Sequence, residues 1–246
     1  MDFRLDGKVA IVTGANRGIG AAIARELASI GARVVVAARG ATALEEVAAS
    51  LGGSGHAVAT DVSNVQDLDR LVAAAVDRFG GVDVLVNNAG VAPPAKQIYK
   101  VTPEEWESTM AVNLRSAWYL SKLCHPHMKQ RGGGAVVNIA STSGLHHDIG
   151  LGVYGISKAA VIMLTTVCAK EWARDRIRVN ALAPGIVRTE LAASIIEYVE
   201  SHDQKPNPMN MLGEPEDIAR LVRFLVTEES RYITGDTIRI DGGEII

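Results

Sequence analysis

The 246-residue sequence predicts an α/β fold built on a doubly wound parallel sheet. Short apolar segments of strand length alternate along the chain with longer segments in which apolar residues recur at helical spacing. Most of the short segments lack polar alternation, which is typical of strands covered on both faces. Strands that alternate with helices in this way form right-handed βαβ units, and hence a parallel sheet.

Seven strands are expected in chain order. They cover residues 8–13, 33–38, 56–60, 82–86, 135–140, 178–182 and 237–240. Helices are predicted at 19–30 and 68–79, where apolar residues share one side. A further helix around Tyr154 carries an apolar stripe made of Ile156, Ala160, Met163, Leu164 and Val167. The least regular segment, 191–211, is a candidate substrate lid. No linker divides the chain, so we expect one domain over residues 1–246.

Composition and charge exclude several classes of protein. The formal net charge is −3, which gives no overall attraction to nucleic acid or to an anionic membrane. No basic region followed by an apolar run opens the chain, and no window approaches eighteen uncharged apolar residues. The two cysteines, Cys124 and Cys168, lie far apart in helix-like segments and are expected to be core thiols. A cytoplasmic protein without nucleic-acid or membrane partners is therefore expected.

A glycine-rich turn follows the first strand directly. It reads Thr13-Gly14-Ala15-Asn16-Arg17-Gly18-Ile19-Gly20 and runs into the first helix. Such a turn lets the backbone approach a pyrophosphate, while the helix N-terminus offers free N–H groups and the positive end of the helix dipole. The spacing is G-x-x-x-G-x-G rather than G-x-G-x-x-G. A tight turn alone can demand glycines, but the position between strand and helix favours a dinucleotide site.

The end of the second strand indicates which dinucleotide. An NAD site carries an acidic residue about 20 residues after the glycines, which binds the ribose 2′-hydroxyl. Here no acid occurs between Glu26 and Glu45, and the strand ends at Arg39. Arg39, with Arg17 in the turn, is suited to a 2′-phosphate. The alternative is that both are solvated surface arginines. NADP(H) is the preferred prediction, with NAD(H) second.

Polar motifs also follow or lie between the later strands. In chain order they are Asp61-Val62, Asn87-Asn88-Ala89-Gly90, Asn113 within MAVNLRS, Ser141, Tyr154-x-x-x-Lys158, and Pro184-Gly185-Ile186 with Thr189. Together with the glycine turn, this ordered set resembles the short-chain dehydrogenase/reductase family, in its compact branch of about 250 residues. The resemblance extends from Gly7 to Gly243. It implies a Rossmann-type domain with a seven-stranded parallel sheet.

The resemblance also implies roles. The catalytic set is Asn113, which supports a proton-relay water, with Ser141, Tyr154 and Lys158. The implied cofactor-binding residues are Gly14, Asn16, Arg17, Gly18, Ile19, Gly20, Arg39, Asp61, Val62, Asn88, Ala89, Gly90, Tyr154, Lys158, Pro184, Gly185, Ile186 and Thr189. The implied assembly is a homotetramer or homodimer, formed through the Tyr154 helix and the helix before it. Trp106 and Trp118 on the earlier helix would face a partner subunit or pack in the core.

The residue types suit proton transfer at a carbonyl oxygen. A free phenol has a pKa of about 10, and a nearby cation favours the phenolate. Tyr154 and Lys158 are four residues apart, so one helix places them on the same face. Ser141 follows a parallel strand at the edge that opens into a ligand crevice, where a hydroxyl can bind the substrate oxygen. An ordinary i, i+4 pair is the alternative, which the other motifs disfavour.

Two pairs of histidines have the residue type to bind a metal or to contact the substrate. His125 and His127 lack the three or four convergent ligands that zinc requires, so no metal is expected. The loop after Ser141 carries His146 and His147, and by analogy with the family that loop lines the substrate pocket. The predicted substrate contacts are Ser141, Ser143, His146 and Tyr154, with His147 as an alternative to His146.

The sequence thus predicts an NADP(H)-dependent oxidoreductase that interconverts a secondary alcohol and its ketone by hydride transfer. One alternative is a 3-oxoacyl thioester reductase acting on acyl carrier protein or CoA, for which Arg131 and Arg174 are candidate docking cations. Another is a non-catalytic nucleotide-binding regulator, which the retained catalytic set disfavours. The acidic residues of the lid segment mildly disfavour strongly anionic substrates.

Overall fold

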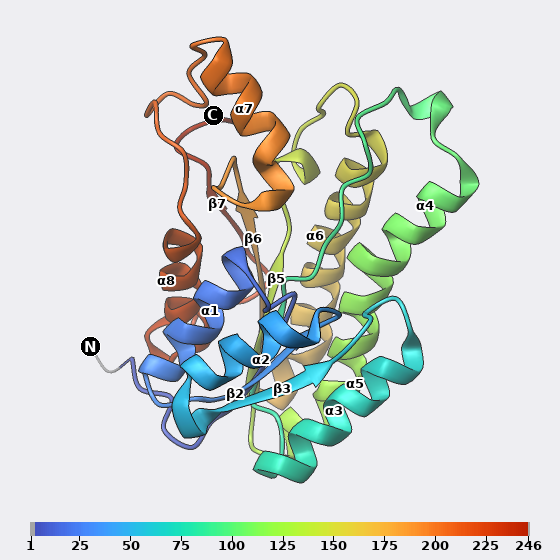
Figure 1. Ribbon diagram of the computed structural model, residues 1–246. Coiled ribbons are helices and arrows are strands. Elements are labelled where there is room, and N and C mark those ends of the chain that lie inside the picture. Colours follow the sequence, from blue (N-terminus) through green and yellow to red (C-terminus); the bar gives the residue numbers. More distant parts are fainter. Residues whose placement is uncertain (1–2, 246) are drawn as a thin grey trace.

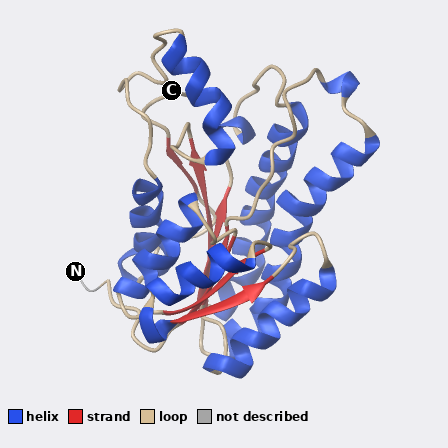
Figure 2. Ribbon diagram, in the orientation of Figure 1, coloured by secondary structure: helices blue, strands red, loops and turns tan. Residues whose placement is uncertain are grey.

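The structure is a computed structural model that describes residues 3–245. Seven parallel strands form one sheet in the order β3-β2-β1-β4-β5-β6-β7. The strands are drawn in red in Figure 2. The strands are β1 (Val9–Thr13), β2 (Arg33–Ala38), β3 (Gly55–Ala59), β4 (Val84–Asn87), β5 (Gly134–Ile139), β6 (Ile177–Pro184) and β7 (Thr237–Ile240). All seven predicted strands are present, with ends within about two residues of the expected ones. The predicted doubly wound parallel sheet is confirmed.

Helices cover both faces of this sheet (Figure 1). They are α1 (Gly18–Ser29), α2 (Ala41–Ser50), α3 (Val65–Phe79), α4 (Pro103–Met110), α5 (Ser116–Gln130), α6 (Gly152–Trp172), α7 (Ala193–Ser201) and α8 (Pro215–Val226). The helices α1, α2 and α8 pack on one face, and α3, α5 and α6 pack on the other.

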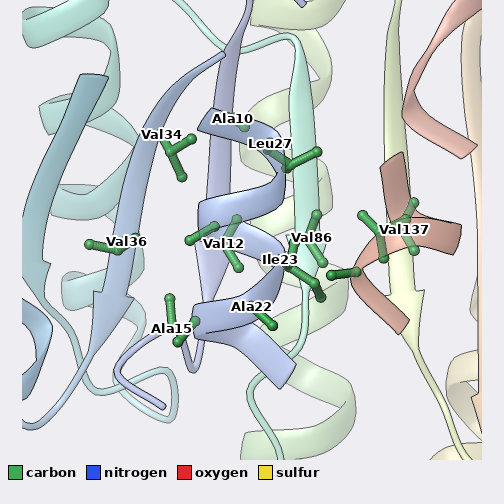
Figure 3. Close-up of a cluster of buried hydrophobic side chains, with 14 of the residues drawn as sticks. Ala10, Val12, Ala15, Ala22, Ile23, Leu27, Val34, Val36, Val86 and Val137 are labelled. Atoms are coloured by element: carbon green, nitrogen blue, oxygen red, sulfur yellow. The ribbon is translucent and has the colours of Figure 1, made fainter. Parts of the chain in front are cut away.

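The two hydrophobic cores arise from the alternation of side chains along each strand. In β1, Ala10 and Val12 point toward α1, where they meet Ile23 and Leu27 (Figure 3). Ile11 lies between them in sequence and belongs to the opposite core. Since both faces are covered, the strands can be apolar throughout, as the sequence predicts.

The strand order reverses beside β1. The chain runs outward through β2 and β3, then returns to β4 on the other side of β1. The carboxyl ends of β1 and β4 therefore open into a crevice, which is the usual ligand position in such sheets. The glycine turn follows β1 there, and the Asn88 segment follows β4.

Two expectations about segments need correction. The segment 191–211 is more regular than predicted, because it contains α7 and the short helical turn η6 (Glu190–Ala192). The apolar stripe of the Tyr154 helix does not face the core, since Ile156, Met163 and Val167 are exposed. The buried face of α6 carries Lys158 between Val153 and Val161, and Leu164 of the predicted stripe is half-buried against the core.

By length and composition alone, Gly152–Asp175 passes the test for a membrane-spanning helix. Core helices pass the same test, and α6 packs along β6 and carries the buried Lys158.

Trp106 and Trp118 are exposed, so the alternative that these two side chains pack in the core is wrong. Trp118 on α5 and Ile156, Met163 and Val167 on α6 are therefore exposed apolar side chains, and partner contact there remains a prediction.

Candidate active site

The glycine turn is shaped by its contact with the loop after β4. Gly14 and Gly18 have left-handed backbone angles, with φ of 63° and 52°. A Cβ atom on Gly20 would lie 2.3 Å from the main-chain oxygen of Gly14, so no larger residue fits. Asn88 binds the turn directly, with its Nδ2 atom donating to the main-chain oxygen of Thr13 at 2.8 Å.

The N-terminus of α1 has the properties of an anion site. Arg17 occupies the N-cap position without a side-chain cap hydrogen bond, and no acidic residue lies in the first turn. The helix N–H groups therefore keep donors free for a ligand, and the dipole favours a negative charge. Ile19, at the start of the helix, packs against the core and fixes the turn. This arrangement fits the pyrophosphate of a dinucleotide.

The predicted 2′-phosphate cations differ in their surroundings. Arg39 is exposed just after β2, and among the residues 3–245 it makes no hydrogen bond or ion pair. Asn16 lies near the adjoining Gly40, with its Nδ2 atom 3.6 Å from the position of a Cβ there. Arg17 instead forms an ion pair with Glu190 at the base of the segment before α7. Arg39 is thus open to a phosphate, whereas Arg17 has to leave a carboxylate first.

The Asp61-Val62 pair lies after β3. The Asp61 carboxylate accepts hydrogen bonds from the Ser63 hydroxyl at 2.7 Å and from its main-chain N–H at 2.9 Å. These bonds lower the pKa of Asp61, and the charge of Arg39 lowers it further. Val62 is buried in the core with α3. Asp61 is therefore held as a carboxylate close to Arg39, at the carboxyl ends of β2 and β3.

The loop after β4 connects the cofactor turn to the catalytic residues. The Thr13 hydroxyl accepts hydrogen bonds from the main-chain N–H groups of Asn88 and Ala89, both at 3.0 Å. A Cβ atom on Gly90 would lie 3.4 Å from Nζ of Lys158 and 3.6 Å from Oδ1 of Asn113. Gly90, Asn113 and Lys158, which come from different elements and were each predicted as site residues, thus lie close together.

Asn113 lies in a π-helical turn, η3 (Ala111–Arg115), between α4 and α5. Such turns are frequent at functional sites. Its amide binds both main-chain groups of Val91, accepting from the N–H at 2.8 Å and donating to the oxygen at 2.9 Å. It also donates to the Ser157 hydroxyl at 2.9 Å. Asn113 therefore fixes the loop after β4 against α6, in addition to its predicted role with water.

Ser141, Tyr154 and Lys158 come together at the carboxyl end of β5. Ser141 precedes the short helical turn η4 (Thr142–Gly144), and its side chain acts to lower the pKa of the nearby Tyr154 phenol. Lys158 is buried, and its Nζ atom donates to the main-chain oxygen of Ile139 at 2.8 Å. The same Nζ atom lies 5.6 Å from the centre of the Tyr154 ring. The predicted helix spacing is confirmed.

The electrostatics differ from the expectation that Lys158 lowers the pKa of Tyr154. Burial raises the pKa of the Tyr154 phenol, the interaction with Ser141 opposes this rise, and the charge of Asp148 adds to it. Burial also lowers the pKa of Lys158 from 10.5 to about 8. The physical reason is that Nζ binds Ile139 rather than the phenol oxygen, so desolvation dominates for both groups.

The predicted substrate loop is held by Asp148. Its Oδ2 atom accepts a hydrogen bond from the Ser143 hydroxyl at 2.6 Å, and its Oδ1 atom lies 3.6 Å from Nδ1 of His146. His146 also lines a surface hollow of about 400 Å³ with Arg239 and other residues near β7. His147 is exposed. Of the two histidines, His146 is the one within the bonded loop.

The segment after β6 closes the other side of the crevice. Thr189 packs on the glycine turn, with its Cγ2 atom 3.3 Å from the position of a Cβ on Gly18. Pro184 ends β6, and the main-chain oxygen of Ile186 accepts a hydrogen bond from Gly213 at 3.0 Å. A Cβ on Gly185 would lie 2.5 Å from Oε2 of Glu244. The predicted cofactor-binding residues of this segment thus lie beside both the turn and the C-terminal segment.

Glu244 was not predicted from the sequence. Its Oε2 atom is buried and has no hydrogen-bond partner within residues 3–245. Burial and the charges of Asp148 and Asp241 raise its pKa to about 7. Thr13, Ser157 and Asp148 were missed as well. Thr13 and Ser157 lie inside quoted motifs, so their positions were available as a signal, but the contacts of Asp148 and Glu244 depend on the tertiary fold.

No metal site accompanies these residues. Across residues 3–245, no group of three or more His, Cys, Asp or Glu side chains is arranged to hold a metal ion. His125 binds Asp175 at 2.9 Å and stacks on Trp172, with ring centres 4.9 Å apart. Asp175 and Trp172 therefore hold the His125 ring in place.

Comparison with known proteins gives the class. The model of the family described as Enoyl-(Acyl carrier protein) reductase matches residues 14–244. The human protein Dehydrogenase/reductase SDR family member 4 is 41% identical over 244 residues, which cover 97% of this chain and 88% of the human one. The chain therefore belongs to the short-chain dehydrogenase/reductase family, whose members are oxidoreductases that act on CH–OH groups with NAD(P).

Two solved structures share the fold over almost the whole chain. The 3-ketoacyl-(acyl-carrier-protein) reductase of Brucella melitensis, complexed with NADH, has a TM-score of 0.93 and 36% identity and covers 98% of this chain and 100% of that one. The L-sorbose reductase of Gluconobacter frateurii, complexed with NADPH and L-sorbose, has a TM-score of 0.92 and 32% identity and covers 100% and 99%. A nicotinamide cofactor is therefore supported for this site.

Proposed function

We propose that this protein is an NADP(H)-dependent oxidoreductase that interconverts a secondary alcohol and its ketone. The observation that carries the proposal is the meeting of Ser141, Tyr154 and Lys158 at the carboxyl end of β5, beside an uncapped helix N-terminus that suits a pyrophosphate. A nicotinamide cofactor supplies or accepts the hydride when it is bound.

The side chains have separate roles in this proposal. The Ser141 hydroxyl holds the substrate oxygen next to the Tyr154 phenol. Tyr154 gives a proton to the carbonyl oxygen in reduction and removes the hydroxyl proton in oxidation. Because burial raises the phenol pKa, Tyr154 is protonated at neutral pH, the form that reduction requires. Lys158 supplies positive charge that stabilises a developing phenolate, and Asn113 keeps its helix and the Gly90 loop in place.

The preference for NADP(H) is supported by Arg39. Its guanidinium is exposed and forms no ion pair within 4 Å among the described residues, and no acid follows β2 in the position that would bind a ribose hydroxyl. The related structures carry NADH in one case and NADPH in the other. Our choice of NADP(H) over NAD(H) therefore rests on Arg39 at the end of β2.

A 3-oxoacyl thioester is a second candidate substrate, favoured by the likeness to the Brucella melitensis reductase. Two positions count against docking of an acidic carrier protein near the site. Arg131 binds the buried Asp83 at 2.9 Å just before β5, and Arg174 lies just before β6. Both are at the amino ends of the strands, whereas Ser141 is at the carboxyl end. The predicted docking cations thus lie at the wrong edge of the sheet.

We further propose a cytoplasmic homotetramer or homodimer that acts on a small carbonyl compound and binds neither nucleic acid nor membrane. Both cysteines are buried and unpaired, which suits a reducing compartment. Trp118 and Met163 are 47% and 64% exposed on the outer face of α5 and α6, where a second copy would cover them. Light scattering across a dilution series tests the assembly, and a monomer at every concentration would contradict it.

The test of the function is a spectrophotometric assay at 340 nm. NADPH and NADH are each offered with ketones, diketones, keto sugars and acetoacetyl thioesters, with Tyr154→Phe as the control. The expected result is turnover that prefers NADPH and is lost in the variant. Preference for the thioester selects the second candidate. If no carbonyl compound is turned over although NADPH binds, the third alternative, a non-catalytic regulator, replaces the proposal.

A further inference from the structure

Asp148 contacts two predicted substrate residues of its own loop. It lies in the loop between η4 and α6, outside every motif described above. Its two carboxylate oxygens face different partners, the Ser143 hydroxyl at 2.6 Å and Nδ1 of His146 at 3.6 Å. Both partners are predicted substrate contacts, so one side chain sets the position of both.

The same carboxylate acts electrostatically on the proton-transfer group. Its negative charge opposes ionisation of the Tyr154 phenol and of the Glu244 carboxyl. The Asp148 side chain is only 33% exposed, so water screens this charge less than it would on an open surface. The substrate end of the site therefore carries a negative charge that acts on the Tyr154 phenol.

We propose that Asp148 is a positioning residue for the reaction: it ties Ser143 and His146 together beside Tyr154 and keeps a fixed negative charge next to the proton-transfer group. This inference rests on the proposed function. Its consequence for specificity is a preference for neutral carbonyl compounds over analogues with a carboxylate near the ketone.

Other charged groups face the same region and must be separated from Asp148. Lys158 lies near the phenol ring, with Nζ 5.6 Å from its centre, and His146 carries positive charge when it is protonated. Glu244 faces Asp148 and Asp241 from the C-terminal segment. A substitution at Asp148 therefore has to change its charge and leave its shape, so that these neighbours keep their places.

The variant Asp148→Asn does this, since its amide oxygen still accepts the Ser143 hydrogen bond. The first readout is the ultraviolet titration of the phenol, assigned by subtracting Tyr154→Phe in each background. We expect the Tyr154 titration to move down by roughly half to one pH unit when the charge is removed. In the oxidation direction, the rising limb of kcat/KM against pH should move down equally, because the phenolate forms at lower pH.

The second readout is substrate charge. For the ketone that is turned over, we compare a carboxylate-bearing analogue with its carboxamide. In Asp148→Asn, KM for the carboxylate should fall roughly threefold relative to KM for the carboxamide, with little change in the ratio of their kcat values. Asp77→Asn is the matched control, because Asp77 is exposed on α3 away from the site and the charge change is identical.

Ser143→Ala separates charge from tethering. It removes the hydroxyl partner and keeps the carboxylate, so KM should rise for both analogues while the phenol titration stays in place. An Asp148→Asn protein with the wild-type titration and the wild-type ratio of KM values overturns the inference, and wild-type turnover then leaves the proposed function standing. If the wild-type protein turns over nothing, the proposed function fails and the phenol titration alone decides on Asp148. If Asp148→Asn does not fold, Asp148→Ser is measured in the same two ways.

Discussion

Asn88 and Thr13 are 75 residues apart in sequence, yet the Asn88 amide donates to the main-chain oxygen of Thr13 at 2.8 Å. The bond joins the ends of β1 and β4, the two strands at which the sheet order reverses. In the opposite sense, the Thr13 hydroxyl accepts from the backbone of the Asn88 loop. The crevice therefore has a rigid wall before any ligand arrives, which reduces the ordering that binding requires.

This wall makes Gly20 intolerant of any side chain. In Gly20→Ala the new Cβ would lie 2.3 Å from the Gly14 oxygen and 2.6 Å from Nδ2 of Asn88, so the turn has to move. We expect a loss of about 2 kcal/mol or more in the free energy of unfolding, together with weakened cofactor binding. Chemical denaturation and NADPH fluorescence titration measure the two effects. Gly53→Ala is the control, since a Cβ there meets nothing within 4 Å; equal losses in both variants would contradict the explanation.

The sequence predicted correctly those features whose pattern lies within a few neighbouring residues. The strands read as apolar runs, the glycine turn lies between β1 and α1, and the four-residue spacing places Tyr154 and Lys158 on one face of α6. Contacts between distant segments were not predictable in this way. The partner of Arg17 is Glu190, and Glu244 reaches Gly185 only because β7 pairs with β6.

The expectation that Lys158 lowers the pKa of Tyr154 was wrong for a related reason. Proximity of a cation is readable from spacing, but desolvation depends on everything that surrounds the phenol. The apolar stripe of α6 did not indicate which side of the helix is buried, because polar Lys158 lies on the buried face while Ile156 and Met163 are exposed.

Arg39 should decide cofactor preference. Replacing it with alanine removes the exposed guanidinium after β2, and we expect KM for NADPH to rise roughly 10- to 100-fold, the range for a hydrogen bond to a charged group. KM for NADH should stay within about twofold, because NADH has no 2′-phosphate. Steady-state kinetics with both cofactors measure this. Parallel changes for NADPH and NADH would mean that Arg39 supports the fold rather than the phosphate.

Glu190 should oppose NADPH binding, because it occupies Arg17 at the glycine turn. The pair is exposed, and such pairs contribute about 0 to 1 kcal/mol. Glu190→Gln should therefore lower Kd for NADPH by at most about fivefold and leave Kd for NADH unchanged. Isothermal titration calorimetry at two salt concentrations checks this, since the effect should shrink at high salt. Arg17→Ala combined with Glu190→Gln is the control, and the gain should disappear in it.

Asn113 should matter more for stability than Ser157, although they share a hydrogen bond. Asn113→Ala breaks both bonds to Val91 and the bond to Ser157. Ser157→Ala breaks the bond to Asn113 and the hydrogen bond that the Ser157 hydroxyl donates to the main-chain oxygen of Tyr154. We expect losses of about 3 and about 1 kcal/mol, since buried groups would be left unpaired in the first case. Denaturant melts measure these values; equal losses would show that Val91 finds other partners.

Lys158 should lower stability while it supports activity. Its pKa falls from 10.5 to about 8 on folding because the ammonium group is buried, so the charged form is disfavoured in the folded protein. Lys158→Met keeps the length of the side chain and removes the charge, at the expense of leaving the Ile139 oxygen without its donor. At pH 7 we expect the variant to be about 1 to 2 kcal/mol more stable, and inactive.

The pH dependence gives the sharper test of Lys158. Between about pH 8 and pH 10.5 the unfolded chain holds the Lys158 proton more than the folded chain does, so wild-type stability rises with pH through this window. The advantage of Lys158→Met should therefore shrink by up to about 3 kcal/mol as the pH rises through it. Urea melts of both proteins from pH 7 to pH 9.5 measure the difference, which also cancels the titration of shared tyrosines. Lys170→Met, in the last turn of α6 and exposed, is the control and should show no such slope. A constant difference between Lys158→Met and the wild type would mean that the Lys158 ammonium group is as well solvated in the folded protein as in the unfolded chain.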